Sequence, residues 1–96
     1  MSDIIEMQRA IYHAAGEYYT AMGEYFVALH PAHQSPKLKE IASRCIAAAV
    51  EYRARLTALL DYALMTGASE VGEIEAERLV RLIELLDMEI QRIGKM

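Results

Sequence analysis

The sequence predicts an all-α protein: an elongated antiparallel bundle of three helices, built from a helical hairpin plus a third helix, that dimerises through its first helix. Three observations support this prediction. The chain has only 96 residues, yet 54 % of them are apolar. Its apolar residues recur at helical spacing in three long segments, and two short segments interrupt that spacing. A chain of this length forms a single domain, here residues 1–96.

The first predicted helix covers residues 3–29. Proline disfavours helical geometry at the residue before it, so Pro31 should end this helix near Leu29. A seam of coiled-coil type repeats every seven residues along it, at Ile4, Ile11, Tyr18 and Tyr25. This seam is the predicted core face of the first helix.

The second predicted helix covers residues 36–66. Ser35 suits the N-cap, and Pro36 suits the first helical position, where a missing N–H costs nothing. Gly67 suits the left-handed residue that closes a helix. The predicted core stripe follows alternating steps of three and four: Leu38, Ala42, Cys45, Ala49, Tyr52, Leu56, Leu59 and Ala63.

The third predicted helix covers residues 70–94, with Ser69 as its N-cap and Gly94 at its end. Acidic residues fill its predicted first turns and basic residues its last, as the helix dipole favours: Glu70, Glu73, Glu75, Arg92 and Lys95. Its predicted core residues are Ile74, Leu79, Leu82, Ile83, Leu86, Ile90 and Ile93. More apolar residues flank the core stripes of the second and third helices: Ile46, Val50, Leu60, Leu64, Val80, Leu85 and Met88. Two apolar rows on one helix indicate neighbours on two sides.

A near-repeat of seven residues stands in the first helix, where AGEYYTA (15–21) is followed by MGEYFVA (22–28). It places Gly16 and Gly23 beside a second apolar column, rotated by about 100° from the core seam and made of Ile5, Tyr12, Tyr19 and Phe26. A glycine inside a helix costs about 1 kcal/mol relative to alanine, which suggests a close approach by another element.

Three interpretations of these glycines are open. A helix of the same bundle lies over them, or they are tolerated on a free surface, or they belong to a face that binds another chain. Three helices with short loops do not easily cover both seams of the first helix, and tyrosine is common at interfaces. We therefore predict a dimer or partner interface at Tyr12, Gly16, Tyr19, Gly23 and Phe26.

The candidates for metal binding are few. His13, Glu17 and Glu24 could share one broad face of the first helix, but di-iron bundle proteins use Glu-x-x-His on paired helices, and that phrase is absent. His30, His33 and Cys45 would supply three of the four ligands that zinc needs, but the cysteine lies on the core stripe. The sequence thus predicts a solvated polar face and a buried thiol, with no metal and no cofactor.

Composition narrows the classes of function. The net charge is −4, and no run of Lys and Arg follows one face, which argues against nucleic-acid and anionic membrane partners. A Gly-rich phosphate loop, a nucleophile elbow and a Cys-x-x-Cys motif are all missing, so an enzyme is not expected. The single cysteine and the lack of a signal-peptide pattern predict a cytoplasmic protein.

Residues 18–60 carry a Tyr-Phe-x-Ala-Leu phrase at 25–29, followed by Tyr52 and Leu56. This stretch resembles the helical hairpins of crescent-shaped membrane-bending dimers. That family has longer helices and a basic membrane face, whereas this chain is short and acidic.

The leading functional hypothesis is a small acidic protein, not an enzyme, that forms a homodimer and binds another protein. An adaptor, a secretion-type chaperone, or an inhibitor encoded by a phage or another mobile element would act in this way. Two alternatives come from other classes: a carrier of a metal or small ligand on the His13, Glu17 and Glu24 face, and a peripheral membrane-surface binder.

Overall fold

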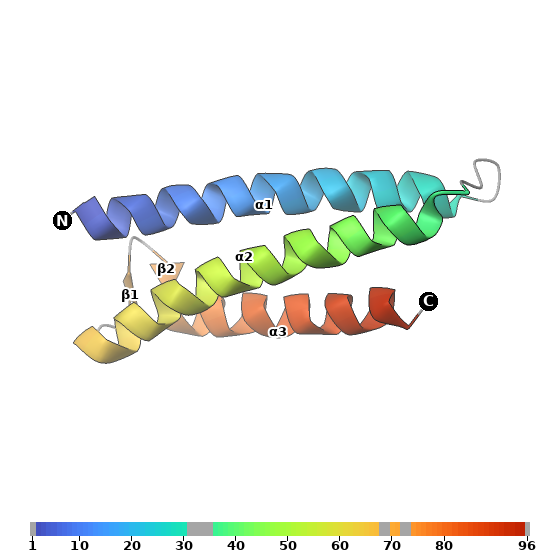
Figure 1. Ribbon diagram of the computed structural model, residues 1–96. Coiled ribbons are helices and arrows are strands. Elements are labelled where there is room, and N and C mark those ends of the chain that lie inside the picture. Colours follow the sequence, from blue (N-terminus) through green and yellow to red (C-terminus); the bar gives the residue numbers. More distant parts are fainter. Residues whose placement is uncertain (1, 31–35, 68–69, 72–73, 96) are drawn as a thin grey trace.

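The computed structural model describes residues 2–30, 36–67, 70–71 and 74–95. These residues form three helices, α1 (Ser2–Leu29), α2 (Leu38–Thr66) and α3 (Ala76–Gly94), with two short strands, β1 (Glu70–Val71) and β2 (Ile74–Glu75), ahead of α3. Helix α2 runs antiparallel to both of its neighbours, and α1 and α3 run parallel to each other (Figure 1). The predicted all-α three-helix bundle is confirmed.

The bundle is elongated, as the sequence predicts. Its extents are 49 × 23 × 16 Å and its radius of gyration is 15.3 Å, compared with about 12.5 Å for a compact domain of this length. The cause is the length of the helices, because α1 and α2 have 28 and 29 residues and each residue adds about 1.5 Å.

The core lies along α2, where α1 and α3 pack against it. On α1, the predicted core residues Ile11, Tyr18 and Tyr25 are at most 6 % exposed, and Ile4 is half-buried. On α2, the whole predicted stripe from Ala42 to Ala63 is buried. On α3, the buried residues stand seven apart, at Leu79, Leu86 and Ile93. The other four predicted core residues of this segment are half-buried, three on α3 and Ile74 on β2. Helix α3 therefore meets the bundle along one narrow stripe.

The third helix begins later than the sequence predicts. Residues 70–71 and 74–75 form an antiparallel ladder that pairs Glu70 with Glu75 and Val71 with Ile74. Glu75 has extended backbone angles, and α3 starts after it, so the predicted helical start at residue 70 is wrong. The local sequence explains the correction, since Val71 is β-branched and Gly72 has a low helix propensity. Ser69 and Glu73, assigned to this helix start, lie outside the described residues.

The ends of α2 differ in how well the sequence predicts them. Pro36 lies in a turn and α2 begins at Leu38, so the proline does not occupy the first helical position. Lys37 has a φ of −97° and a ψ of 16°, outside the helical region, and the helix can begin only after it. Ser35 lies outside the described residues. At the other end, the prediction for Gly67 is confirmed, because it is left-handed with a φ of 69°.

Candidate interaction surface

The second apolar column of α1 faces solvent. Its four side chains have exposed fractions of 53 % for Ile5, 69 % for Tyr12, 63 % for Tyr19 and 54 % for Phe26. Single exposed apolar residues are ordinary on a protein surface. Four of them at seven-residue intervals over about 32 Å of helix form a row on one face. The structure therefore separates the two columns of α1, with one in the core and the other in solvent.

The two glycines beside this column are open to solvent. A Cβ atom built on Gly16 or Gly23 meets nothing within 4 Å. No described segment of the chain therefore packs over them, and the interpretation that a helix of the same bundle lies there is wrong. The backbone carbonyl of Gly16 accepts a hydrogen bond of 2.9 Å from the Thr20 hydroxyl, which stays within α1.

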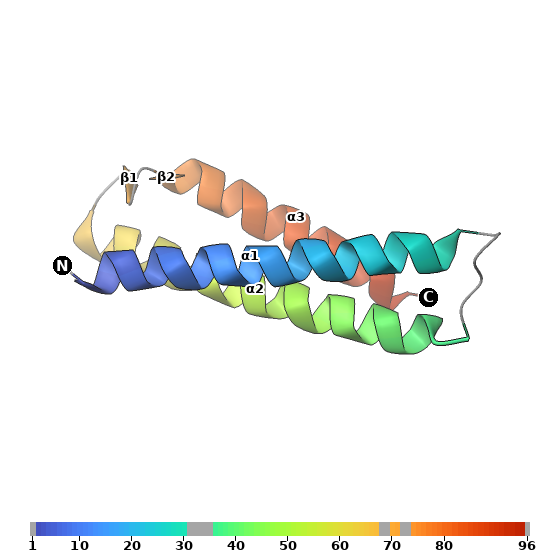
Figure 2. The same cartoon turned by 90° about the horizontal axis from the view of Figure 1, so that it is seen from above.

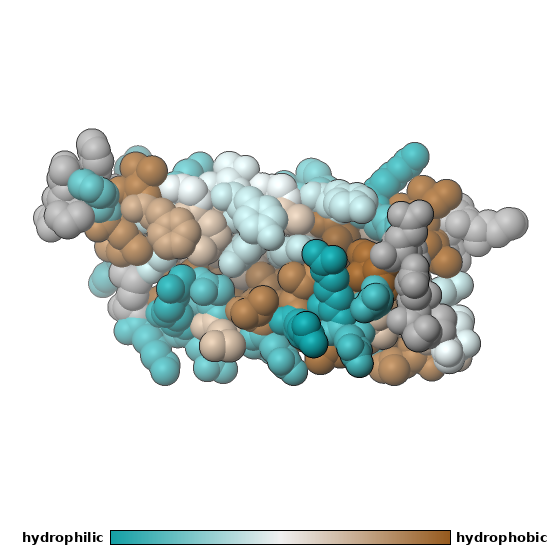
Figure 3. Space-filling model, turned by 180° about the vertical axis from the view of Figure 1, so that it is seen from behind, coloured by the Kyte–Doolittle hydropathy of each residue, from teal (hydrophilic) through white to brown (hydrophobic). Residues whose placement is uncertain are grey.

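The exposed column forms one wall of a groove between α1 and α3. Two hollows of about 490 and 330 Å³ share Tyr19, Tyr52 and Leu82, so they are parts of one groove. Helix α2 supplies the floor through Tyr52 and Leu56, and the second wall comes from Ile74 of β2 and from Leu82 and Leu85 of α3. Figure 3 shows this side of the molecule, with apolar surface between α1 along the top and the polar lower edge formed with α3.

The groove follows from the way the helices are arranged. Helix α2 packs against both α1 and α3, whereas α1 and α3, seen from above, diverge toward the end of the bundle that carries the β ladder (Figure 2). Each of the outer helices thus has one flank without a neighbour among the described residues. On α1 this flank carries the aromatic column, and on α3 it carries Leu82 and Leu85.

Three tyrosines gather where the α1 wall meets the floor of the groove. The ring centroids of Tyr18 and Tyr19 both lie near Tyr52, at 5.7 and 6.4 Å. Burial and the negative charge of Glu89 raise the pKa of Tyr18 to about 12. Burial, followed by interaction with Tyr19, raises the pKa of Tyr52. These two phenols are therefore neutral at physiological pH, and the groove floor is uncharged but can exchange hydrogen bonds.

The edge of the groove formed by β2 and α3 is the charged one. Glu75, Arg78, Glu89 and Arg92 line it, and the last two form an ion pair. Two bases and two acids line this edge, so their formal charges balance.

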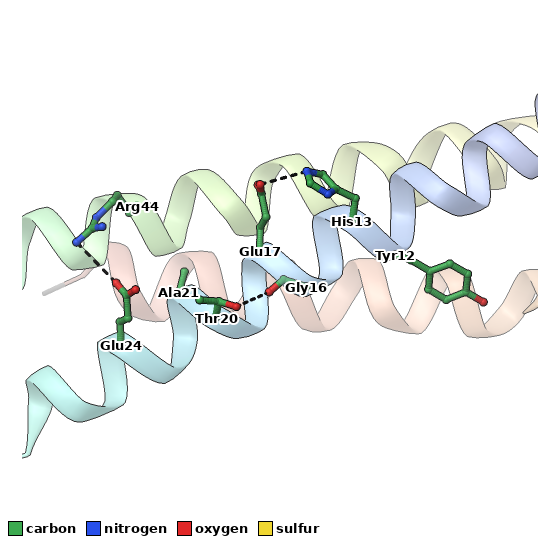
Figure 4. Close-up of a pocket in the computed structure, with 8 residues that line it drawn as sticks. All are labelled: Tyr12, His13, Gly16, Glu17, Thr20, Ala21, Glu24 and Arg44. Carbon is green, nitrogen blue, oxygen red and sulfur yellow. Dashed lines mark hydrogen bonds and ion pairs between the residues drawn. The ribbon is translucent and has the colours of Figure 1, made fainter.

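The polar face of α1 does not assemble into the candidate metal site. His13 Nε2 lies 3.2 Å from Glu17 Oε1, but Glu24 turns toward Arg44 of α2 at 3.7 Å (Figure 4). The structure brings the first two candidates together and gives the third another partner. Within the described residues, no group of three or more His, Cys, Asp or Glu side chains is placed to hold a metal ion.

Cys45 is a core residue, as the sequence predicts. It is fully buried, and its thiol donates to the Met22 sulfur at 3.0 Å. Burial, and to a lesser degree the charge of Glu89, raises the pKa of the thiol, which keeps it in the unreactive protonated form. His33, the other end of the proposed His-x-x-H group, lies outside the described residues.

The sequence predicts the aromatic column but not the groove. Its spacing places Tyr52 and Leu82 in the core and Leu85 in a flanking row, yet all three line the hollow. The sequence feature that points to the groove is the pair of apolar rows on α3, because two rows on one helix indicate neighbours on two sides.

Comparisons with known proteins give no match, whether to protein-family models, to curated proteins or to solved structures. No helix in the described part of the chain has the length and apolar character needed to cross a membrane. The geometry of the groove and of the aromatic column is thus the basis for a functional proposal.

Proposed function

We propose that the protein is not an enzyme and acts by binding other proteins, a second copy of itself among them, through the α1–α3 groove and the aromatic column beside it. The observation that carries the proposal is the row of four exposed apolar side chains along α1. Large apolar side chains that gather in the open on one face commonly mark a protein interaction site. The lone buried Cys45 supports a role in the reducing cytoplasm.

The shape of the groove favours a helix as its occupant. Helices α1 and α3 run in the same direction (Figure 1) and both pack against α2, an arrangement that resembles three positions of a four-helix bundle. An amphipathic helix laid along the groove would meet apolar residues on both walls, as in other helix-in-groove complexes. Tyr12 and Tyr19 suit such a contact because a tyrosine ring buries apolar surface while its hydroxyl remains hydrogen-bonded to water.

The total surface of the chain supports association. The chain exposes 6669 Å², whereas a monomeric protein of 10.8 kDa exposes about 5,500 Å². A stable interface takes about 800 Å² from each partner. Covering the groove and the aromatic column would therefore remove most of the surplus.

Sedimentation equilibrium at micromolar concentration tests self-association. We expect the wild-type chain to sediment as a dimer and the Tyr12→Glu variant to shift to a monomer of 10.8 kDa. Leu64→Glu is a matched control, since Tyr12 and Leu64 are both 69 % exposed and Leu64 does not line the groove. A wild-type monomer, or an equal effect of the two substitutions, would contradict the proposed role of this surface.

Binding to a different protein has its own test. Affinity capture from native cell extract should recover a partner with the wild-type chain and with Leu64→Glu, and lose it with Tyr12→Glu. A partner retained by all three chains would bind elsewhere on the molecule.

A further inference from the structure

We propose that two copies of α1 pair antiparallel, with Tyr12 and Tyr19 of each copy seated over Gly23 and Gly16 of the other. This inference rests on the self-association proposed above and adds its register and its symmetry. The partner is thus a second copy of this chain.

The register follows from the spacing of rings and glycines. The two tyrosines are seven residues apart, and so are Gly16 and Gly23. In an antiparallel pair, placing Tyr12 opposite Gly23 therefore places Tyr19 opposite Gly16 at the same time. The match holds in both directions, so a twofold axis passes between residues 17 and 18 and the interface closes on itself.

A parallel pair does not offer the same match. Parallel helices related by a twofold axis set each residue opposite its own copy, which places ring against ring and glycine against glycine. Shifting one helix by four residues would bring Tyr12 over Gly16, but that contact is not symmetric and leaves unpaired faces that continue into open chains of molecules. The antiparallel pair is the closed solution.

The structure leaves this face free to pair. Both tyrosines are more than 60 % exposed, and the space over both glycines is empty to 4 Å from a built Cβ. The same register sets Arg9, which is exposed, opposite Phe26, where a guanidinium group on an aromatic ring is favourable.

The two acidic residues of α1 nearest the glycines do not oppose the pairing. Glu17 and Glu24 are engaged with His13 and Arg44 on the edge of α1 that faces α2, and Tyr12 points away from that edge (Figure 4). The two carboxylates that share a hollow with Gly16 thus each have a partner, and the face that would meet the second copy otherwise carries aromatic rings and glycines.

Filling the two recesses tests the contact. We expect the dissociation constant of the dimer to rise at least about 30-fold in the Gly16→Leu/Gly23→Leu double variant, the loss typical when an anchoring ring is displaced. Ala47→Leu/Ala54→Leu is the matched control, because these residues are also seven apart and exposed, on the outer face of α2, and it should leave the constant unchanged. Circular dichroism checks that each variant folds, and Gly16→Ala/Gly23→Ala serves as the milder pair if the leucines disturb α1.

Distances between spin labels test the register. Labels at Glu6→Cys and Thr20→Cys occupy exposed positions, and the buried Cys45 stays unlabelled. The antiparallel register places the two copies of residue 6 about 35 Å apart and the two copies of residue 20 about 12 Å apart.

The outcomes separate this inference from the proposal on which it rests. A dimer with one long and one short distance supports the antiparallel register. A dimer with two short distances is parallel, and a dimer indifferent to the glycine substitutions pairs elsewhere; either result overturns the register but leaves self-association standing. A wild-type monomer overturns both.

Discussion

Replacing Gly16 and Gly23 by alanine should stabilise the isolated chain. A glycine in a helix interior is less favourable than alanine by about 1 kcal/mol, and an added methyl group at either position meets nothing within 4 Å. Neither glycine has a positive φ, in contrast to Gly67. The double variant should therefore gain about 2 kcal/mol in its free energy of unfolding.

The control is the same substitution at Gly67. A methyl group there would also meet nothing within 4 Å, but Gly67 has a φ of +69°. The left-handed conformation costs a residue with a Cβ about 1 to 2 kcal/mol, so Gly67→Ala should lose stability. The substitutions add a methyl group to equally open space at each glycine. Opposite changes in the free energy of unfolding would therefore identify the backbone conformation as the cause.

Thermal unfolding followed by circular dichroism measures both effects. For a chain of this size each kcal/mol corresponds to about 4 to 8 °C in Tm, so the double variant should melt about 8 to 16 °C higher. The melts are run at the lowest practical concentration, because a dimer would add its own concentration-dependent stability. A lower Tm for Gly16→Ala/Gly23→Ala at this dilution would refute the reasoning, since it would show that part of the same chain packs on the glycines.

Three further outcomes test the core. The pKa of Tyr18 is raised from 10.0 to about 12. The contribution of the neutral phenol to the free energy of unfolding is therefore fully present below pH 10 and should fall by up to about 3 kcal/mol as the pH rises to 12. Urea unfolding at several pH values should show a smaller fall for Tyr18→Phe. Leu56→Ala, at a site only 1 % exposed, should lose about 2 to 5 kcal/mol, whereas Leu85→Ala, at a site 57 % exposed, should lose less than about 1 kcal/mol; equal losses would contradict the assigned core. Asp87→Asn should cost less than about 1 kcal/mol in the same assay, because the ion pair of Asp87 with Arg53 is about 40 % exposed on both sides, and a larger loss would show that the pair is coupled to the core.

Much of the fold could be predicted because a helix buries residues at a fixed spacing. The steps of three and four from Ala42 to Ala63 select the residues of α2 that are buried. The beginning of α3 could not be predicted in the same way. Ser69 and the glutamates that follow it fit a helix start, but the pairing of Val71 with Ile74 depends on a contact between two strands, which a helical pattern does not report.

The candidate surface was predictable on one side only. The column from Ile5 to Phe26 lies on a single helix, so its spacing alone predicts a second face. The groove depends on the distance between α1 and α3, and no pattern within either helix sets that distance. Leu82 illustrates the limit, because its spacing fits the core stripe while its side chain also lines the hollow.

Two features that destabilise the isolated chain occur on the same face of α1. The glycines make the helix less stable by about 2 kcal/mol together, and the neighbouring column leaves four large apolar side chains more than half exposed. Glycines that are merely tolerated would give no reason for the two features to coincide. Glycines that admit rings from a second copy explain both, because the exposed rings and the empty spaces are then two halves of one contact. The two interpretations predict different effects of Gly16→Ala on the dimer. If the glycines admit rings from a second copy, this variant should raise the stability of the monomer and weaken the dimer.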